Sequence, residues 1–340
     1  KKIRNFNEED IHGNHFLDKL LIFTTHDTLS RKKFRDLAST IDGPIFIIAD
    51  EVHAVGSELR LGGLLENYQF RLGLSATPTR YFDDEGTLAL KQYFGDTVYE
   101  FTLKDAIEHK FLVPYRYIPR VVELTDEEFE KYKELTKKIA RKLGAMDGKE
   151  KSEELSFFIE GVRADVIASA VKKYDAFEDI LNEIPKLEYA LIYCNDKQME
   201  RAKNILFQRD AVFHQITYRE STEERRRILD LMSSRVYDAT LAIRCLDEGM
   251  DIPSAKLGIL LASSGNPRQF IQRRGRLLRT KEGKTEAIIY DILVVPYLNR
   301  DISKEVTELE QKIVRKELDR FQEFANSSQN KEESQKVIDE

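Results

Sequence analysis

A short apolar run is followed at once by two carboxylates and then by a histidine. Residues 45–49 are all apolar, Asp50 and Glu51 come directly after them, and His53 lies two residues further on. Consecutive apolar residues without alternation are typical of a central strand of a parallel sheet that is covered on both faces. Open α/β sheets bind their ligands at the carboxyl ends of the strands. The acids therefore stand where a magnesium ion and an activated water would use their charge, which otherwise costs desolvation free energy.

The pair of acids has both a chemical and a structural interpretation. In a nucleotide hydrolase the first acid holds magnesium, usually through water, and the second orients and polarises the attacking water. An acidic turn between a strand and a helix, with Asp50 as its N-cap, requires no chemistry at all. Residues 50–53 do not by themselves decide between the two interpretations.

Two hydroxyl side chains stand at the end of the next predicted strand. Ser75 and Thr77 flank Ala76 after the run at 70–74. Because neighbouring strands of a parallel sheet end side by side, these hydroxyls can meet His53. Taken alone, the triplet is typical of a turn. Its position after the acid pair is what points to chemistry.

One face of a predicted helix that begins at Pro267 combines an amide with two guanidinium groups. Gln272, Arg276 and Arg279 share that face because they are four and three residues apart. Arg276 and Arg279 can reach a transferred phosphate and neutralise its charge in the transition state. An amphipathic surface helix is the structural alternative.

The loop at 245–255 supplies two further candidates, directly after an apolar run. Gly249 permits an unusual backbone conformation. Asp251 can accept a hydrogen bond from a ribose hydroxyl, or it can cap a turn, and the sequence leaves both interpretations open.

The composition is that of a globular protein. The 340 residues are 41% hydrophobic and 34% charged, and the net charge is −6. No apolar run approaches the roughly 18–20 residues that span a bilayer, and residues 1–10 lack the apolar stretch of a signal peptide. We therefore expect no membrane partner. Two cysteines exclude a disulfide framework. The expected location is the cytoplasm, or the nucleus if the protein is eukaryotic.

Basic residues cluster in two stretches, although the chain is acidic overall. Seven lysines and arginines against one acid occupy residues 268–284, and a second cluster comprises Arg219 and residues 225–227. A nucleic-acid-binding protein need not be basic overall if its basic residues gather at the binding surface. For the second cluster a solvated helix face is an equally good interpretation.

Strands and helices alternate along the chain in a pattern that predicts parallel α/β sheets. Early in the chain we expect a helix at 27–40 and strands at 20–25, 45–49 and 70–74. In the later part we expect strands at 189–194, 211–214, 239–245, 257–263 and 286–293. Between the two parts lies a charged helical stretch, which opens with a capping box formed by Thr125 and Glu128.

The change of character along the chain predicts five segments. The first domain should occupy 1–124 and end in a strand at 114–124, followed by a helical arm or insertion at 125–184. The remaining segments are a second domain at 185–300, a terminal helix at 301–325 and a disordered tail at 326–340.

At four stretches the chain resembles the superfamily 2 helicases and translocases. Asp-Glu-Val-His at 50–53 would be their motif II, Ser-Ala-Thr at 75–77 motif III, residues 247–251 motif V and residues 272–279 motif VI. The order and spacing of these stretches carry the resemblance, which covers residues 20–300. It implies the fold class α/β, with two RecA-like parallel-sheet domains, the first incomplete, joined by a helical insertion. ATP would bind between the domains and nucleic acid across both.

The resemblance also implies a role for each matching residue. ATP and Mg²⁺ would be the cofactors, with Asp50 as the magnesium ligand and Glu51 as the catalytic base. The residues that would couple hydrolysis to strand movement are His53, Ser75, Ala76 and Thr77. Those that would complete the catalytic site are Gln272, Arg276 and Arg279, and those that would touch the nucleotide are Gly249 and Asp251. Nucleic-acid contacts are expected at Thr24, Thr25, Tyr193, Arg244 and Ser264.

Within the superfamily, residues 116–132 and the helical arm look most like three groups of motor proteins. These are the xeroderma pigmentosum B-type repair helicases, the restriction-enzyme motor subunits and related double-strand DNA translocases. The resemblance favours DNA over RNA as the partner.

The chain departs from the family in one respect, since no GxxxxGK[ST] phosphate loop precedes motif II. The sequence Gly283-Lys284-Thr285 has Leu278 where the first glycine is required, and it leads into a predicted strand rather than a helix. We therefore expect the phosphate loop to come from a missing N-terminal segment or from a partner chain, and this chain alone to be inactive.

The predicted function is that of the motor core of an ATP-dependent DNA helicase or translocase, acting on duplex or single-stranded DNA. One alternative is an RNA helicase or double-strand RNA sensor, because such proteins also carry a helical insertion. A second is a non-enzymatic nucleic-acid clamp or assembly module, which would explain the missing phosphate loop. A third is an α/β fold whose motifs are coincidental.

Overall fold

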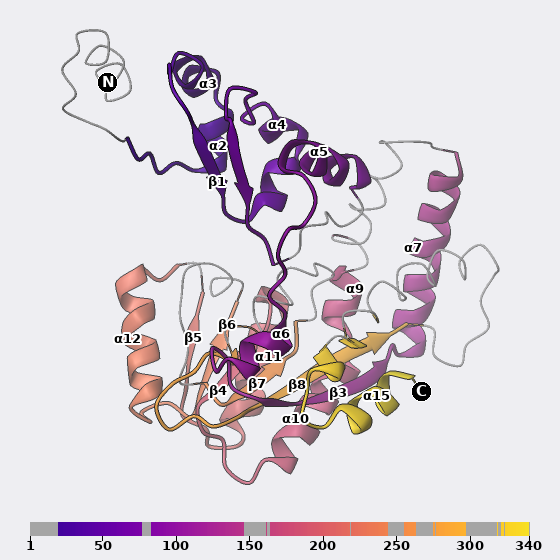
Figure 1. The fold of residues 1–340 in the computed structure, drawn as a ribbon. Helices are drawn as coiled ribbons and strands as arrows, with labels where there is room; N and C mark the ends of the chain where they lie inside the picture. Colours follow the sequence, from indigo (N-terminus) through magenta and orange to yellow (C-terminus); the bar gives the residue numbers. More distant parts are fainter. Residues whose placement is uncertain are drawn as a thin grey trace. The chain divides into compact units, whose positions relative to one another are not determined.

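The computed structural model describes residues 20–76, 83–145, 161, 164–217, 219–243, 255–262, 275, 277–296, 318, 321–322 and 324–339. The chain divides into two compact units, Lys1–Glu100 and Phe101–Glu340 (Figure 1). The division precedes the strand at 115–123, which pairs with the second sheet, so the expected domain boundary at residue 124 lies too late. Among the described residues no helix is long and apolar enough to cross a membrane.

The first unit contains a pair of parallel strands and several short helices. β1 (Phe46–Ala49) pairs with β2 (Phe70–Gly73) so that Ala49 lies opposite Gly73, and both strands end at the same edge. This is the arrangement that the strand–helix–strand pattern predicts. The helical elements are α2 (His26–Ser30), α3 (Lys32–Ala38), the 3-10 helix η1 (Val52–Gly56), α4 (Glu58–Leu61) and α5 (Asp84–Phe94).

The β1–β2 pair has one buried and one exposed face. On the buried face Ala49 packs with Val52 and Leu90. On the other face Phe46 and Ile48 are 56% and 57% exposed. The sequence predicted that β1 is covered on both faces. This is wrong for the described residues, because the described side chains pack against only one face of β1.

Two further local expectations are wrong in the first unit. Residues 20–25 form no strand, and Phe23 is 89% exposed. The predicted helix at 27–40 is interrupted at Arg31, whose extended backbone (φ −67°, ψ 135°) separates α2 from α3. An apolar run becomes a strand only when a neighbour pairs with it, and pairing is not a local property of sequence.

The second unit is built on a six-stranded sheet in which every pair of neighbours is parallel. The strand order is β3-β8-β7-β4-β6-β5. All five strands expected in the second domain are present, and β3 joins them at one edge. Their bounds are β3 (Tyr115–Glu123), β4 (Ala190–Tyr193), β5 (Phe213–Ile216), β6 (Ala239–Ala242), β7 (Leu257–Leu260) and β8 (Ala287–Val295).

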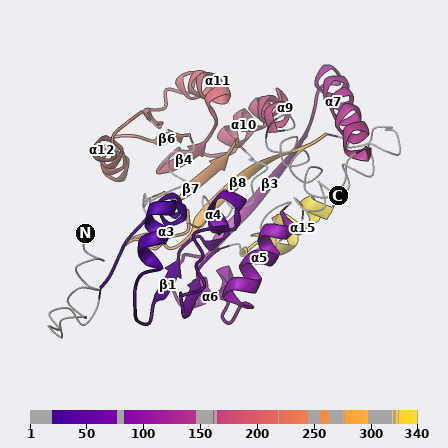
Figure 2. The same cartoon turned by 90° about the horizontal axis from the view of Figure 1, so that it is seen from above.

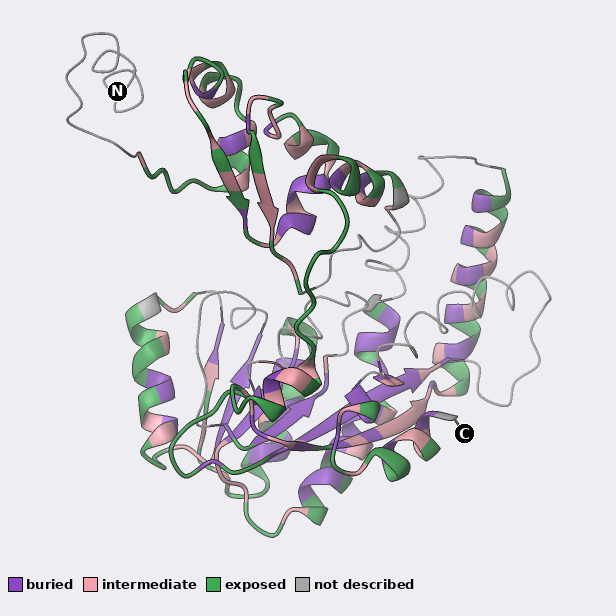
Figure 3. Cartoon of the chain, in the orientation of Figure 1, coloured by how far each residue is buried: buried purple, intermediate pink, exposed green. Residues whose placement is uncertain are grey.

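Apolar side chains cover both faces of this sheet, so its central strands are buried throughout (Figure 3). On one face lie Phe177 of α10 (Lys172–Glu183) and Ile205 of α11 (Asp196–Phe207). On the other lie Leu229 of α12 (Thr222–Ser233) and Phe324. Figure 2 shows α10 and α11 along one side of the sheet and α15 (Lys331–Asp339) on the other. A short helix, α6 (Leu103–Glu108), opens the unit.

The expected helical arm is only partly separate from the second sheet. α7 (Asp126–Gly144) begins at the predicted capping box, in which Glu128 N donates to the Thr125 hydroxyl and Thr125 N donates to the Glu128 carboxylate. α9 (Ala164–Ser169) follows. α10 is not part of an arm, since Phe177 and Ile180 are fully buried against the sheet. The expected boundary at 184 is therefore too late, because the apolar face of α10 belongs to the second core.

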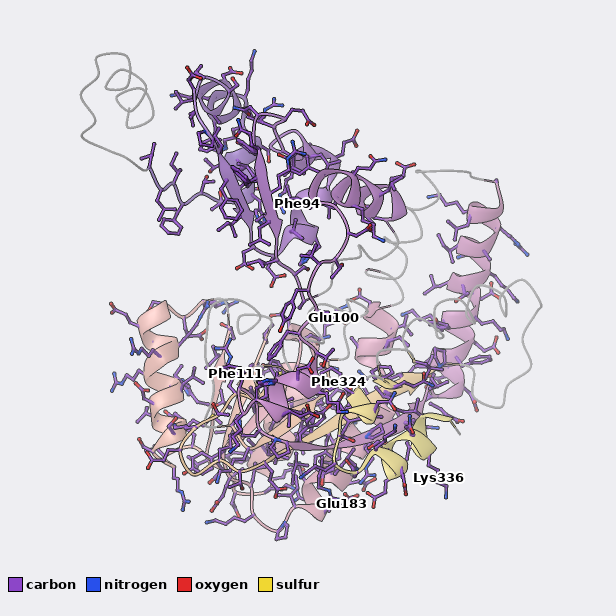
Figure 4. All side chains as sticks on the ribbon, viewed as in Figure 1. Phe94, Glu100, Phe111, Glu183, Phe324 and Lys336 are labelled. Carbon is purple, nitrogen blue, oxygen red and sulfur yellow. The ribbon has the colours of Figure 1, made fainter. Side chains whose placement is uncertain are left out.

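The expectation of a disordered tail at 326–340 is also wrong. α15 and the residues before it lie along the edge strand β3, and Phe324 and Lys336 of this segment are labelled in Figure 4. The Asn330 side chain accepts a hydrogen bond from Tyr117 N and donates one to Tyr117 O, both at 2.9 Å, as a neighbouring strand would. Sheet edges require such cover. The polar composition that suggested disorder therefore provides hydrogen bonds to a strand more than 200 residues away.

Candidate active site

The turn that carries the two acids lies beside the end of the neighbouring strand. The hydrogen-bond ladder continues past β1 and β2, because Leu74 N donates to Ala49 O and Val52 N donates to Leu74 O, each at 2.9 Å. Gly73 permits this close approach, since a Cβ at that position would lie 3.1 Å from Val52 Cγ2. The sequence-predicted edge, with Asp50 on one strand end and Ser75 on the next, is therefore present.

Glu51 has a left-handed backbone conformation, with φ 48° and ψ 48°. For a residue with a Cβ this conformation costs roughly 1–2 kcal/mol, and such strain persists where the surroundings impose it, often at active sites. Asp50 Oδ1 accepts a hydrogen bond from Glu51 N at 2.9 Å, which helps to hold the turn. Asp50 is exposed and the Glu51 side chain is 41% exposed, although Glu51 Oε2 is itself buried beside His53.

His53 links the acid pair to the neighbouring strand. Its Nδ1 lies 3.0 Å from Ser75 Oγ and 3.3 Å from Glu51 Oε2, and the residue is only 7% exposed. With a proton on Nδ1 the ring donates to Ser75 Oγ, and without it the ring accepts from the Ser75 hydroxyl. The meeting of His53 with Ser75 that the sequence predicts is confirmed, and Ala76 follows as an exposed residue.

The exposed carboxylate of Asp50 fits a magnesium ion that arrives with a nucleotide. Mg²⁺ keeps several waters and is usually bound through one or two carboxylates together with substrate phosphates. Within the described ranges no group of three or more His, Cys, Asp or Glu side chains is placed to hold a metal ion. A single carboxylate with Glu51 beside it is a donor set of the kind that a nucleotide-bound magnesium uses.

Two candidates of the second unit do not stand where the sequence predicts. The Tyr193 side chain is fully buried in the core, so it does not reach nucleic acid. Arg279 is exposed, but its backbone forms an antiparallel bridge with Leu112, after the helical residues 275 and 277. Arg279 therefore lies past the end of the helix and not on the helical face predicted for it, because tertiary pairing with Leu112 ends the helix first.

The remaining candidates are either engaged locally or outside the described residues. Thr25 is the N-cap of α2, where its hydroxyl accepts from Thr28 N at 3.2 Å, and Thr24 is exposed beside it. Candidates that lie outside the described residues are Thr77, Arg244, Gly249, Asp251, Ser264, Gln272 and Arg276.

Sequence reasoning missed two lysines that are buried in the second unit. Lys173 Nζ donates to Leu261 O and Lys284 Nζ donates to Leu277 O, each at 2.6 Å. Lysine is almost never fully buried unless it is paired. Hydropathy pointed away from burial at both positions, and no local pattern marks either residue.

The strain at Glu51 leads to a prediction about stability. Glycine adopts a φ of 48° without strain, so Glu51→Gly should stabilise the turn against local opening by about 0.5–1 kcal/mol. Glu51→Ala removes the same carboxylate but keeps the Cβ, and it should give no such gain. Hydrogen exchange at the amides of Val52 and Leu74, which donate across this edge, measures the difference. Equal protection in the two variants would show that the backbone is not strained.

The comparison with protein families identifies a domain in the second unit. The family described as helicase conserved C-terminal domain matches residues 172–281. The match begins at α10 and runs through β4, β5, β6 and β7 to the turn before β8. The second unit therefore carries a helicase C-terminal domain, which confirms the class of protein that the motifs imply.

Two curated relatives extend the likeness beyond this domain. The DNA 3'-5' translocase XPB2 of Sulfurisphaera tokodaii is 31% identical over 268 residues, which cover 73% of this chain and 58% of the relative. A protein of Sulfolobus islandicus filamentous virus, provisionally named helicase 22, is 23% identical over 266 residues, which cover 77% and 44%. The chain thus spans about half the length of these relatives.

A solved structure supports the fold. The ATP-dependent Type ISP restriction-modification enzyme LlaBIII bound to DNA matches 97% of this chain and 24% of its own, with a TM-score of 0.55 and 14% identity. At that identity the likeness concerns the fold alone. It agrees with the α/β class and the parallel sheets described above.

Proposed function

We propose that the chain forms part of an ATP-dependent DNA translocase, in which ATP is hydrolysed at Asp50 and Glu51. The observation that carries the proposal is the 3.0 Å contact between His53 Nδ1 and Ser75 Oγ. It joins the turn that bears the acids to the end of the neighbouring strand. A movement of one of these segments would therefore shift the other. The helicase C-terminal domain at 172–281 supports the same function from the second unit.

The residues of the first unit have separate tasks. Asp50 would hold Mg²⁺, which when bound neutralises charge on the phosphates. The Glu51 carboxylate orients the attacking water and accepts its proton. His53 lies 3.3 Å from Glu51 Oε2 and contacts Ser75 Oγ, so it stands between the carboxylate and the neighbouring strand. From the second unit we assign Gln272, Arg276 and Arg279 to the transferred phosphate, with Gly249 and Asp251 at the nucleotide.

DNA is the proposed substrate because the relative at 31% identity is named as a DNA 3'-5' translocase. Binding to a phosphate backbone does not depend on sequence, and it uses lysines and arginines. The described basic residues available for it include Arg226 and Arg227, which are exposed on α12. Thr24, Thr25, Arg244 and Ser264 are further proposed contacts.

The phosphate loop is proposed to come from another polypeptide segment or from a partner chain. The one Gly-Lys-Thr sequence, at 283–285, stands in a turn before β8 and not before a helix. The exposed face of the β1–β2 pair supports the proposal, because parallel sheets are normally covered on both faces. Phe46, Ile48 and Phe70, which are more than half exposed there, would be covered by an added strand and helix.

The test is ATP hydrolysis by a polypeptide that contains this sequence together with a strand–GxxxxGK[ST]–helix segment, either in a natural protein or in an engineered fusion. We call it the phosphate-loop polypeptide. Duplex DNA should stimulate hydrolysis more than duplex RNA of the same sequence. Glu51→Gln should lower kcat by about 10²- to 10⁴-fold, because it removes the general base while keeping shape and hydrogen bonding.

Asp27→Asn is a matched control, since it also neutralises an exposed acid of the first unit, one that pairs with Arg60 instead. It should leave hydrolysis within about twofold, because an exposed ion pair contributes little to stability. Stronger stimulation by RNA would transfer the proposal to an RNA helicase. Full activity in Glu51→Gln would refute the assignment of the site.

A further inference from the structure

Lys284 is a buried lysine whose ammonium group lies at the end of the helical segment that includes Leu277. The residue is 6% exposed, and its Nζ donates to the backbone oxygen of Leu277 at 2.6 Å. Leu277 belongs to the last turn of that segment, whose terminal carbonyl oxygens have no helical partner. A cationic donor at a helix C-terminus satisfies such an oxygen and also interacts favourably with the helix dipole. Lys284 therefore acts as a side-chain cap on this turn.

The turn that Lys284 caps is held from a second side as well. Val113 N donates to Leu278 O at 2.8 Å, and the next residue, Arg279, forms the antiparallel bridge with Leu112. Leu277 is itself packed closely onto β7, since a Cβ on Gly258 would clash with Leu277 Cδ1. The pairing with residues 112–113 and the packing of Leu277 on β7 thus fix the backbone that leads directly into Arg279.

The position of Lys284 depends on a constrained turn. Gly283 has a φ of 76°, which a residue with a Cβ rarely adopts, and Lys284 N donates to Lys281 O at 2.9 Å. Lys256 Nζ, from the residue before β7, donates to Gly283 O at 3.0 Å and so holds the same turn. Burial of an ammonium group is costly unless it is well paired. The hydrogen bond to Leu277 O offsets part of this cost for Lys284.

We propose that Lys284 is a positioning residue for Arg279, which it serves by fixing the end of the helical segment from which Arg279 emerges. The proposal rests on the proposed function, in which Arg279 neutralises charge on the transferred phosphate. The Arg279 guanidinium group supplies the positive charge, and Lys284 fixes the position of the backbone that carries it. The Gly-Lys-Thr sequence at 283–285 is therefore not a phosphate loop, and its lysine serves to position Arg279.

The first test is hydrogen exchange in the full chain. Lys284→Met keeps the length and apolar stem of the side chain but removes the donor. It should speed exchange at the Val113 amide, which reports on Leu278 O, by about tenfold or more. The Leu261 and Cys194 amides, which are bonded within the sheet, should change by less than about twofold. Glu282→Met is the control, because it places the same side chain at an exposed position of the same turn.

The second test is ATP hydrolysis in the phosphate-loop polypeptide. Lys284→Met should lower kcat about tenfold with less than about a twofold change in KM for ATP, because a displaced Arg279 affects the transition state more than binding. Lys284→Arg, which keeps a donor, should recover part of kcat. Glu282→Met should leave kcat unchanged.

The outcomes separate this proposal from the proposed function. Unchanged exchange at Val113 in Lys284→Met, or equally faster exchange throughout the second sheet, would overturn the positioning role. An equal loss in kcat and in the affinity for ATP would also overturn it. If the unsubstituted polypeptide shows no hydrolysis with DNA, the proposed function fails, and the exchange experiment still decides whether Lys284 fixes the turn.

Discussion

The purified chain, with saturating duplex DNA, should hydrolyse ATP no faster than its own Glu51→Gln variant. Phosphoryl transfer depends on positioning and charge neutralisation, and the phosphate loop supplies the lysine and hydroxyl that hold the β- and γ-phosphates and magnesium. The sequence has no GxxxxGK[ST]. Its one Gly-Lys-Thr lysine, Lys284, is 6% exposed and donates to Leu277 O, so it does not reach a nucleotide. Release of phosphate should stay far below the kcat of about 1 s⁻¹ that marks the lower end of typical enzymes.

The acid pair makes this prediction open to contradiction. Asp50 and Glu51 lie beside the His53–Ser75 contact, so the residues proposed for half of a hydrolytic site stand together in the first unit. Robust turnover by the chain alone, lost in Glu51→Gln, would show that residues outside the described ranges supply a phosphate site. Duplex DNA binding by the same sample is the control, because it shows that the inactive protein is folded.

Duplex DNA binding by the chain should weaken by about 10³-fold or more between roughly 50 and 200 mM salt, if about six or more phosphates are neutralised. The net charge is −6, so no general attraction to DNA operates and binding must come from local clusters of lysine and arginine. Two such clusters lie at 219–227 and 268–284. Each phosphate contact releases bound counterions, and added salt opposes that release.

Fluorescence anisotropy over a series of salt concentrations measures the slope of this dependence. Unrelated duplex sequences should bind within about threefold of one another, because phosphate contacts carry no sequence information. The paired substitutions Arg226→Gln and Arg227→Gln, on exposed positions of α12, decide whether the cluster at 219–227 takes part. A contact with phosphate predicts a slope lower by about one for each residue, and a solvated helix face predicts no change. Salt-independent binding would contradict a translocase that follows the backbone.

Local patterns accounted for much of the fold. The Thr125–Glu128 capping box stands where the sequence places it, because a cap involves residues only three apart. β1, β2 and the strands of the second sheet follow apolar runs of the expected length. The edge that brings Asp50 next to Ser75 follows from the parallel order of two strands. For these features the sequence was sufficient, since neighbouring residues in the chain hold the relevant information.

Contacts between distant residues were decided by the tertiary structure. The helix expected to include Arg279 ends earlier because Leu112 pairs with Arg279, and the expected disordered tail is ordered because Asn330 bonds to Tyr117. The strand β3 joined the second sheet because its partner is β8, far along the chain. Such pairings depend on which surfaces meet, and composition or periodicity within a window does not report them.

The sequence by itself pointed to the residues proposed for ATP hydrolysis, and it predicted the parallel order that puts Asp50 and Ser75 at one edge. The tertiary structure alone decided how they are held, with Glu51 in a left-handed conformation and His53 between two oxygens. It also turned Lys284 inward and Tyr193 into the core. The physical reason is that residue type sets what a side chain can do, whereas burial, strain and partner are properties of the packed chain.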